Sequence, residues 1–167
     1  SLHELCDLGP AENPGDIRTI MDQYGVKVEW LRVDDCFRVI SKYSDGAPMD
    51  VTMPSGIEPF IDKMEEYVPG SRPQMTKLFD LFQEVLDGIA YITASSGHAD
   101  SNVLKEKYPN MLRTGAYPTK KVFDALKLPL RAQDILSTYW SYLGVDMEHL
   151  AFIHYAAMVH KYISRSA

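Results

Sequence analysis

The sequence is poor in the residues on which several kinds of site depend. Its only cysteines are Cys6 and Cys36, too few for a disulfide framework or a cysteine-rich zinc cluster. We expect both to be reduced thiols, as in a cytoplasmic protein. No metal site is predicted.

Long apolar runs and an excess of basic residues are also missing. No segment approaches the ~18 consecutive apolar residues of a membrane-spanning helix. The chain has 17 Lys and Arg residues against 23 Asp and Glu residues, a formal net charge of -6. Because an acidic surface repels phosphate backbones, the composition argues against a nucleic-acid partner.

Common catalytic and cofactor motifs are absent from the sequence. It contains neither the G-x-G-x-x-G pattern nor the P-loop pattern, and no serine lies in a nucleophile elbow. His149, His154 and His160 are spaced too widely to share the i, i+4 face of a zinc-binding helix. The residues alone therefore define no complete catalytic constellation.

Alternation of apolar and polar residues marks the N-terminal third. After a predicted helix over residues 16–24, Val26 and Val28 alternate with charged residues, and similar alternation covers residues 37–43 and 49–53. This period of two predicts three strands, each with one packed face and one solvated face.

Helical periodicity dominates the rest of the chain. Helices are predicted over residues 55–68, 71–94, from Thr119 to Pro129, over a segment that packs residues 135–143 and stops at Gly144, and over residues 146–163. The fold class is therefore α+β: mostly helical, with a small antiparallel β-meander near the N-terminus packed by several helices.

Local details of these helices give further expectations. Ser55 with Glu58, and Ser71 with Gln74, have capping-box spacing. Gly88 lies in the apolar stripe of its helix, which suggests close approach by another element. The last helix has apolar residues around most of its circumference and should be buried on several sides. The pair Glu65-Glu66 reads as a solvated helix face, and residues 98–118 as a lid or an ordinary connector.

Aromatic residues in the helices have two interpretations. They can line a long hydrophobic pocket that binds an apolar substrate, or they can simply belong to the core. The candidate substrate-binding residues are Tyr91, Tyr139, Trp140, Tyr142, Phe152 and Tyr155.

The order of these features resembles the phytoene desaturase-like flavoproteins of the amine-oxidase superfamily. The resemblance rests on D-L-G-P at residues 7–10, the following helix, V-E-W-L-R-V-D-D-C-F-R-V at residues 28–39, and M-D-V at residues 49–51. The helix after Ser55, with its exit E-E-Y-V-P-G at residues 65–70, matches as well. The resemblance is most specific over residues 5–82.

This resemblance implies an FAD-linked oxidoreductase that acts on a C–C bond of an apolar substrate. Leu8, Gly9 and Pro10 correspond to the family's flavin-adjacent strand, so residues 1–10 are a remnant of the flavin domain. Residues 1–167 are then a single substrate-binding cap fragment, inactive alone. The parts of such an enzyme that hold the dinucleotide are absent from the fragment. FAD is therefore expected in the full-length parent and not in the fragment.

The alternative is a stand-alone helical module that binds lipid or another protein. The two interpretations differ in exposed apolar surface. A fragment should expose the face that meets its missing FAD-binding domain and self-associate through it, whereas an independent module should not.

Overall fold

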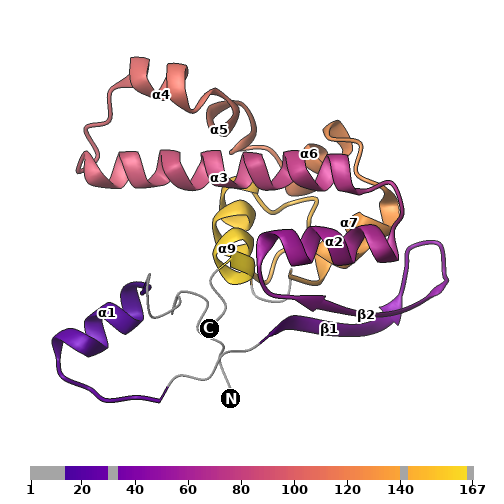
Figure 1. The fold of residues 1–167 in the computed structure, drawn as a ribbon. Helices are drawn as coiled ribbons and strands as arrows, with labels where there is room; N and C mark the ends of the chain where they lie inside the picture. The colour runs from indigo at the N-terminus through magenta and orange to yellow at the C-terminus, as the bar shows by residue number, and fades with distance from the viewer. Residues whose placement is uncertain (1–13, 30–33, 140–142, 165–167) are drawn as a thin grey trace.

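The computed structural model describes residues 14–29, 34–139 and 143–164. Helices predominate, and a two-stranded antiparallel sheet near the N-terminus packs against them (Figure 1). The expected α+β class is therefore confirmed. The elements are, in chain order, α1 (Asp16–Gln23), β1 (Asp35–Lys42), β2 (Pro48–Pro54), α2 (Ile57–Tyr67), α3 (Arg72–Ala94), α4 (Ser101–Lys107), α5 (Pro109–Thr114), α6 (Thr119–Ala125), α7 (Leu130–Leu136), the 3-10 helix η1 (Ser137–Tyr139) and α9 (Phe152–Ser164).

The hairpin of β1 and β2 has one apolar face and one polar face. Met49, Val51 and Met53 are buried where β2 packs against α2. Asp50, between them in sequence, points to solvent and forms an exposed ion pair with Arg38 of β1 at 2.8 Å. The alternation in the sequence therefore corresponds to the two faces of the sheet.

The first of the three predicted strands is not formed in residues 26–29. Val26 and Val28 have no regular secondary structure and are 48% and 42% exposed. A strand needs hydrogen bonds from a neighbouring strand, and the sheet in the described part of the chain consists of β1 and β2 alone. The preceding helix is confirmed as α1, which stands apart from the other described helices (Figure 1).

The core lies around α3, which runs across the molecule while α9 passes beneath it (Figure 1). Phe82 of α3 is fully buried, and its ring centroid lies 5.7 Å from that of Phe152 and 5.9 Å from that of Tyr155. The last helix is buried on several sides, as its sequence predicts. The buried residues of α9 are Phe152, Tyr155, Ala156, Val159, His160, Tyr162 and Ile163.

The predicted capping box at Ser55 is wrong. The N-cap of α2 is Gly56, and no side chain caps this helix. Ser55 instead ends the hairpin, where its hydroxyl donates to the Asp34 carbonyl at 3.1 Å and its backbone N–H donates to the same oxygen at 2.7 Å. The local spacing predicts that the Ser55 hydroxyl caps α2, but the hydroxyl instead bonds to Asp34, which is distant in sequence.

The predicted capping box at Ser71 is also wrong, because a carboxylate from α2 takes its place. Ser71 is the N-cap residue of α3 but makes no side-chain cap. The Glu65 carboxylate accepts from the backbone N–H groups of Gly70 and Arg72, each at 2.6 Å. Glu65 is thus not part of a plain solvated face; it joins the end of α2 to the start of α3.

We expect Glu65→Ala to destabilise the fold at neutral pH and to lose this effect in acid. The hydrogen bond from Gly70, followed by that from Arg72, lowers the pKa of Glu65 below its ordinary value of 4.5. The charged form therefore contributes stability above pH 4.5, and this contribution is lost as the pH falls through the pKa of the folded state.

Urea unfolding of the wild type and the variant at pH 7 and pH 3 measures this contribution. The matched control is Glu66→Ala, which removes a neighbouring carboxylate that pairs only with the exposed Lys63. A Glu65→Ala deficit of equal size at both pH values would contradict the capping role.

The helices after α3 differ from the predicted ones in length and number. Residues 98–118, predicted to be a lid or an ordinary connector, contain two short helices, α4 and α5. The predicted helix that packs residues 135–143 is replaced, within the described residues, by α7 and η1.

The last helix begins later than predicted, at Phe152. The Asp146 carboxylate accepts from the backbone N–H of Glu148 at 3.0 Å, so a local turn forms there. Ala151 then forms an antiparallel bridge with Pro118. The backbone N–H groups of Phe152 and Ile153 donate to the Tyr117 and Gly115 carbonyls, so a longer helix could not use them for its own hydrogen bonds.

Gly88 permits the close approach that its position in the stripe suggests. A Cβ atom at residue 88 would collide with Met111 Sδ and would lie 2.9 Å from Met111 Cε and 3.3 Å from Tyr108 Cγ. Because residue 88 has no side chain, α5 can lie directly on α3. This contact places α5 beside the pocket described below.

None of the helices in the described ranges combines the length and the apolar character needed to cross a bilayer.

Candidate functional site

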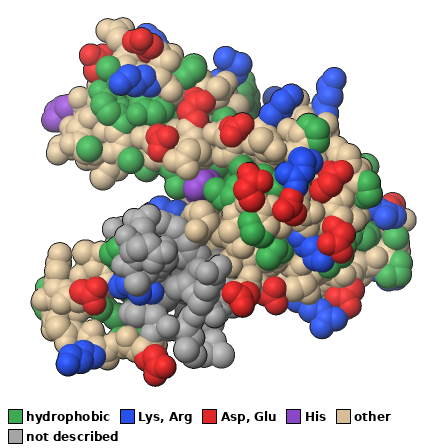
Figure 2. Space-filling model, in the orientation of Figure 1, with side chains coloured by type: hydrophobic (Ala, Val, Ile, Leu, Met, Phe, Trp, Pro, Cys, Tyr) green, Lys and Arg blue, Asp and Glu red, His purple; other side chains and the backbone are tan. Residues whose placement is uncertain are grey.

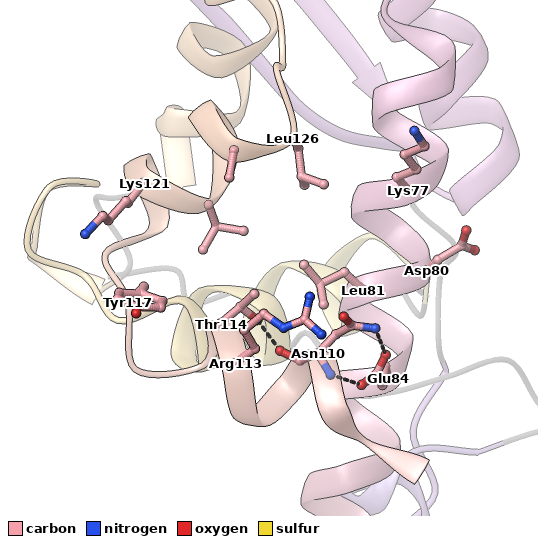
Figure 3. A pocket seen from close by; sticks show the side chains of 12 residues that line it. Lys77, Asp80, Leu81, Glu84, Asn110, Arg113, Thr114, Tyr117, Lys121 and Leu126 are labelled. Carbon is pink, nitrogen blue, oxygen red and sulfur yellow. Dashed lines mark hydrogen bonds between the residues drawn. The ribbon is translucent and has the colours of Figure 1, made fainter. Parts of the chain in front are cut away.

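A pocket with a volume of about 540 Å³ opens between α3, α5 and α6 (Figure 3). Ligand pockets typically have volumes of about 300–1,000 Å³, so this one is large enough for a small organic molecule. The elements that form it are not all neighbours in sequence, since α4 and α5 lie between α3 and α6 along the chain.

One wall of the pocket is apolar. Leu81 of α3, Val122 and Ala125 of α6, and Leu126 just after α6 line it. The ring of Tyr117 adds a flat surface (Figure 3). Leu81 and Val122 are buried, while Leu126 is half-buried. Such a wall favours an apolar ligand, since contact removes apolar surface from water.

Charged side chains surround this wall. Figure 3 shows Lys77 and Asp80 on α3, with the Asp80 carboxylate directed away from α5 and α6. Lys121 lies at the opposite edge, where its Nζ atom is 4.9 Å from the centroid of the Tyr117 ring. The Arg113 side chain extends from α5 toward α3 (Figure 3). With Glu84, the lining contains three cationic side chains and two acidic ones.

Glu84 fixes α5 against α3 at the base of the pocket. Its carboxylate accepts from the backbone N–H of Asn110 at 2.6 Å, from Asn110 Nδ2 at 2.8 Å and from the backbone N–H of Met111 at 3.1 Å. These bonds satisfy backbone donors at the start of α5. The carboxylate thus has a structural role.

The lining residues form a binding surface without an evident reaction centre. Neither cysteine nor histidine lines the pocket, and the Thr114 hydroxyl donates to the Asn110 carbonyl at 2.7 Å. In the described part of the chain no group of three potential ligands is placed to hold a metal ion. The arrangement can bind and desolvate a ligand but provides no nucleophile–base pair.

Charge is mixed on the surface outside the pocket. Figure 2 shows acidic and basic side chains interspersed over the face formed by α2, α3 and the hairpin. The visible face therefore has no extended patch of one sign.

Phe152 and Tyr155, two of the predicted substrate-binding residues, lie in the core and do not line the pocket. The Tyr155 hydroxyl donates to the Leu136 carbonyl at 2.9 Å. Complete burial raises the pKa of Tyr155 far above its ordinary value of 10.0. For these two residues the structure corresponds to the core interpretation.

Of the other predicted substrate-binding residues, Tyr91 has a described side chain, and it does not line the pocket. Tyr91 is half-buried in the last turns of α3; its ring centroid lies 5.9 Å from that of Tyr108, and its hydroxyl accepts from the Asp100 N–H at 3.2 Å. Tyr139 ends η1, but its side chain is not described. The remaining predictions fall outside the described residues: Trp140, Tyr142, Leu8, Gly9 and Pro10.

Sequence reasoning did not single out the residues that do line the pocket. Arg113 and Tyr117 belong to the segment of residues 98–118 that was expected to be a lid or a connector. Leu81 lies at the edge of the apolar stripe of α3. The one indication in the sequence was the weak hydrophobic periodicity of residues 98–118. It suggested a surface segment but did not identify any residue as part of a pocket.

The described residues do not fit FAD. A pyrophosphate is normally held by a glycine-rich loop that opens a helix. The glycines with positive φ in the described residues occur one to a turn and are widely separated: Gly25, Gly46, Gly56, Gly70, Gly97 and Gly144. No glycine-rich loop of this kind is formed in the described residues.

Comparison of the chain with protein-family models, with curated proteins and with solved structures gave no match.

Proposed function

We propose that this chain is the substrate-binding, helical cap portion of a flavin-dependent oxidoreductase of the phytoene dehydrogenase-like type. Its substrate would be an apolar molecule whose C–C bond exchanges hydride with the flavin. The flavin carries that chemistry, while the cap orients the substrate and removes it from water. The chain alone is not expected to be catalytic.

The pocket between α3, α5 and α6 carries this proposal. Its volume of about 540 Å³ and the wall formed by Leu81, Val122 and Leu126 suit an apolar ligand. The resemblance of residues 5–82 to flavoproteins supplies the reaction type. On this proposal, FAD is held by a domain outside the 167 residues, in a cytoplasmic protein.

The absorption spectrum of the complete gene product, purified without added cofactor, tests the proposal. We expect flavin bands in that spectrum and none in the spectrum of residues 1–167. A colourless complete product that also fails to take up added FAD would reject the oxidoreductase and leave the helical lipid-binding or protein-interaction module.

The cap and the module differ in the apolar surface that they should expose. Tyr24 is 81% exposed and Ile40 is 71% exposed, and in a cap such side chains would meet another domain or a second copy of the chain. Sedimentation of residues 1–167 should therefore show self-association, and a hydrophobic dye should bind. A monodisperse monomer without dye binding would favour the module.

A further inference from the structure

We propose that the pocket between α3, α5 and α6 selects an amphipathic ligand with one carboxylate, and that Arg113 is the residue that binds this carboxylate. The inference deepens the proposed function, on which it rests for the fate of the ligand. It names the substrate class for the same pocket, and it can be tested by binding alone.

Arg113 has no acidic partner among the described residues. The ion pairs found there join other groups, including Arg38 with Asp50, and Arg131 with Asp45. The Arg113 side chain is exposed and extends across the gap between α5 and α3 (Figure 3). A planar guanidinium beside an apolar wall is therefore available to a ligand.

Neither neighbouring acid forms an ion pair with this guanidinium in the described part of the chain. Glu84 lies closest in Figure 3, but its carboxylate already accepts three hydrogen bonds from Asn110 and Met111. The Asp80 carboxylate is directed away from α5 (Figure 3). A ligand carboxylate would thus be the natural partner for Arg113.

The two lysines at the rim are less suited than Arg113 to bind the ligand head group. Lys121 extends over the ring of Tyr117, with 4.9 Å between Nζ and the ring centroid. Lys77 lies on α3 beyond the apolar wall (Figure 3). Both add positive potential, but Arg113 alone presents the planar fork that binds a carboxylate through two parallel hydrogen bonds.

The apolar wall determines the rest of the ligand. An alkyl or polyene chain over Leu81, Val122 and Leu126 would exclude water from one side of the guanidinium. A neutral ligand would also exclude this water, but it would not replace the hydration that the guanidinium loses. A carboxylate replaces that hydration with hydrogen bonds of its own. The guanidinium fork also fits a phosphate monoester, so decyl phosphate is compared with decanoate in the experiment below.

Calorimetric titration of residues 1–167 with decanoate and with its neutral analogue decanamide tests this inference. We expect wild type to bind decanoate about tenfold more tightly, as one charge-assisted contact at an exposed site allows. Arg113→Gln should abolish this preference without weakening decanamide binding, and Arg113→Lys should restore part of it. Ala125→Leu, which fills the pocket, should weaken both ligands.

Lys105→Gln is the matched control, because it removes an exposed cation from α4, outside the pocket. Circular dichroism verifies that each variant is folded. Equal affinity for the two ligands, unchanged decanoate binding in Arg113→Gln, or no binding by folded wild type would each overturn the inference. Tighter binding of decyl phosphate than of decanoate would overturn the assignment to a carboxylate.

The flavin experiment gives an independent result. Decanoate binding through Arg113 in a protein whose complete gene product lacks flavin would uphold this inference and reject the oxidoreductase. Flavin bands together with no preference for decanoate would uphold the oxidoreductase and reject this inference.

Discussion

Replacement of Phe82 by alanine is expected to lower the free energy of unfolding by about 3–5 kcal/mol, the usual cost of deleting a buried aromatic ring. Phe82 has no exposed surface and lies where α3 meets α9. Its ring centroid is 5.4 Å from that of Phe79, 5.7 Å from that of Phe152 and 5.9 Å from that of Tyr155. Alanine would leave a cavity that these rings cannot fill without moving the two helices apart.

Urea unfolding followed by circular dichroism measures the loss. Phe82→Leu, which keeps most of the volume, should cost clearly less than Phe82→Ala. Gln83→Ala is the surface control on the same helix and should change the stability by no more than about 0.5 kcal/mol. A Phe82→Ala value close to that of Gln83→Ala would show that α3 and α9 do not pack as described.

Replacement of Gly88 by valine is expected to cost about 1–3 kcal/mol, as over-packing of a filled site does. A Cβ atom alone would collide with Met111 Sδ and approach Met111 Cε to 2.9 Å. Met111 is buried, so its side chain has little room to move aside. Valine adds two methyl groups and should push α5 away from α3, although glycine is itself a poor helix former.

Ala90→Val is the matched control for this variant, because residue 90 is exposed on the same helix. It should cost only the small difference in helix propensity, about 0.5 kcal/mol. The double variant Gly88→Val/Met111→Ala should be less destabilised than the sum of its single variants, because the shorter side chain frees space for valine. Additive effects would contradict a direct contact between residues 88 and 111.

The same substitution at Gly88 connects stability to the pocket. Arg113 and Thr114 reach the pocket from α5, whose position depends on the contact with Gly88 and on the bonds between Glu84 and Asn110. Displacement of α5 should therefore also reduce the preference for decanoate over decanamide. The effect would be indirect, since Gly88 does not line the pocket.

Two glutamates show where sequence reasoning stops. Glu65 binds the N–H groups of Gly70 and Arg72, and Glu84 binds those of Asn110 and Met111. In both cases a carboxylate on one helix satisfies donors near the start of another. Capping-box spacing considers only the four residues from the N-cap to N3, so it assigned this task to Ser55, whose hydroxyl donates to Asp34, and to Ser71, whose hydroxyl donates to Glu65 at 3.4 Å.

The residues that line the pocket could not be predicted from the sequence for a similar reason. The aromatic residues singled out by periodicity include Phe152 and Tyr155, and periodicity identifies the face of a helix that is buried. It does not distinguish a core from a cavity, because both require the same apolar face. Arg113 and Tyr117 lie in a segment of weak periodicity, so nothing local marked them as lining residues.

The sequence by itself determined the elements whose form depends on near neighbours. The alternation of residues 37–53 gave the hairpin, the stripe of α3 gave its length and its close approach at Gly88, and the apolar circumference of α9 gave its burial. Only the tertiary structure decided which carboxylates cap which helices, where α9 begins, and which side chains meet at the pocket. Some of these contacts join residues far apart in the chain, such as Glu84 with Asn110, 26 positions away, and no local pattern encodes such a pairing. Others, such as Glu65 with Arg72, are only seven positions apart but depend on the turn that joins two helices.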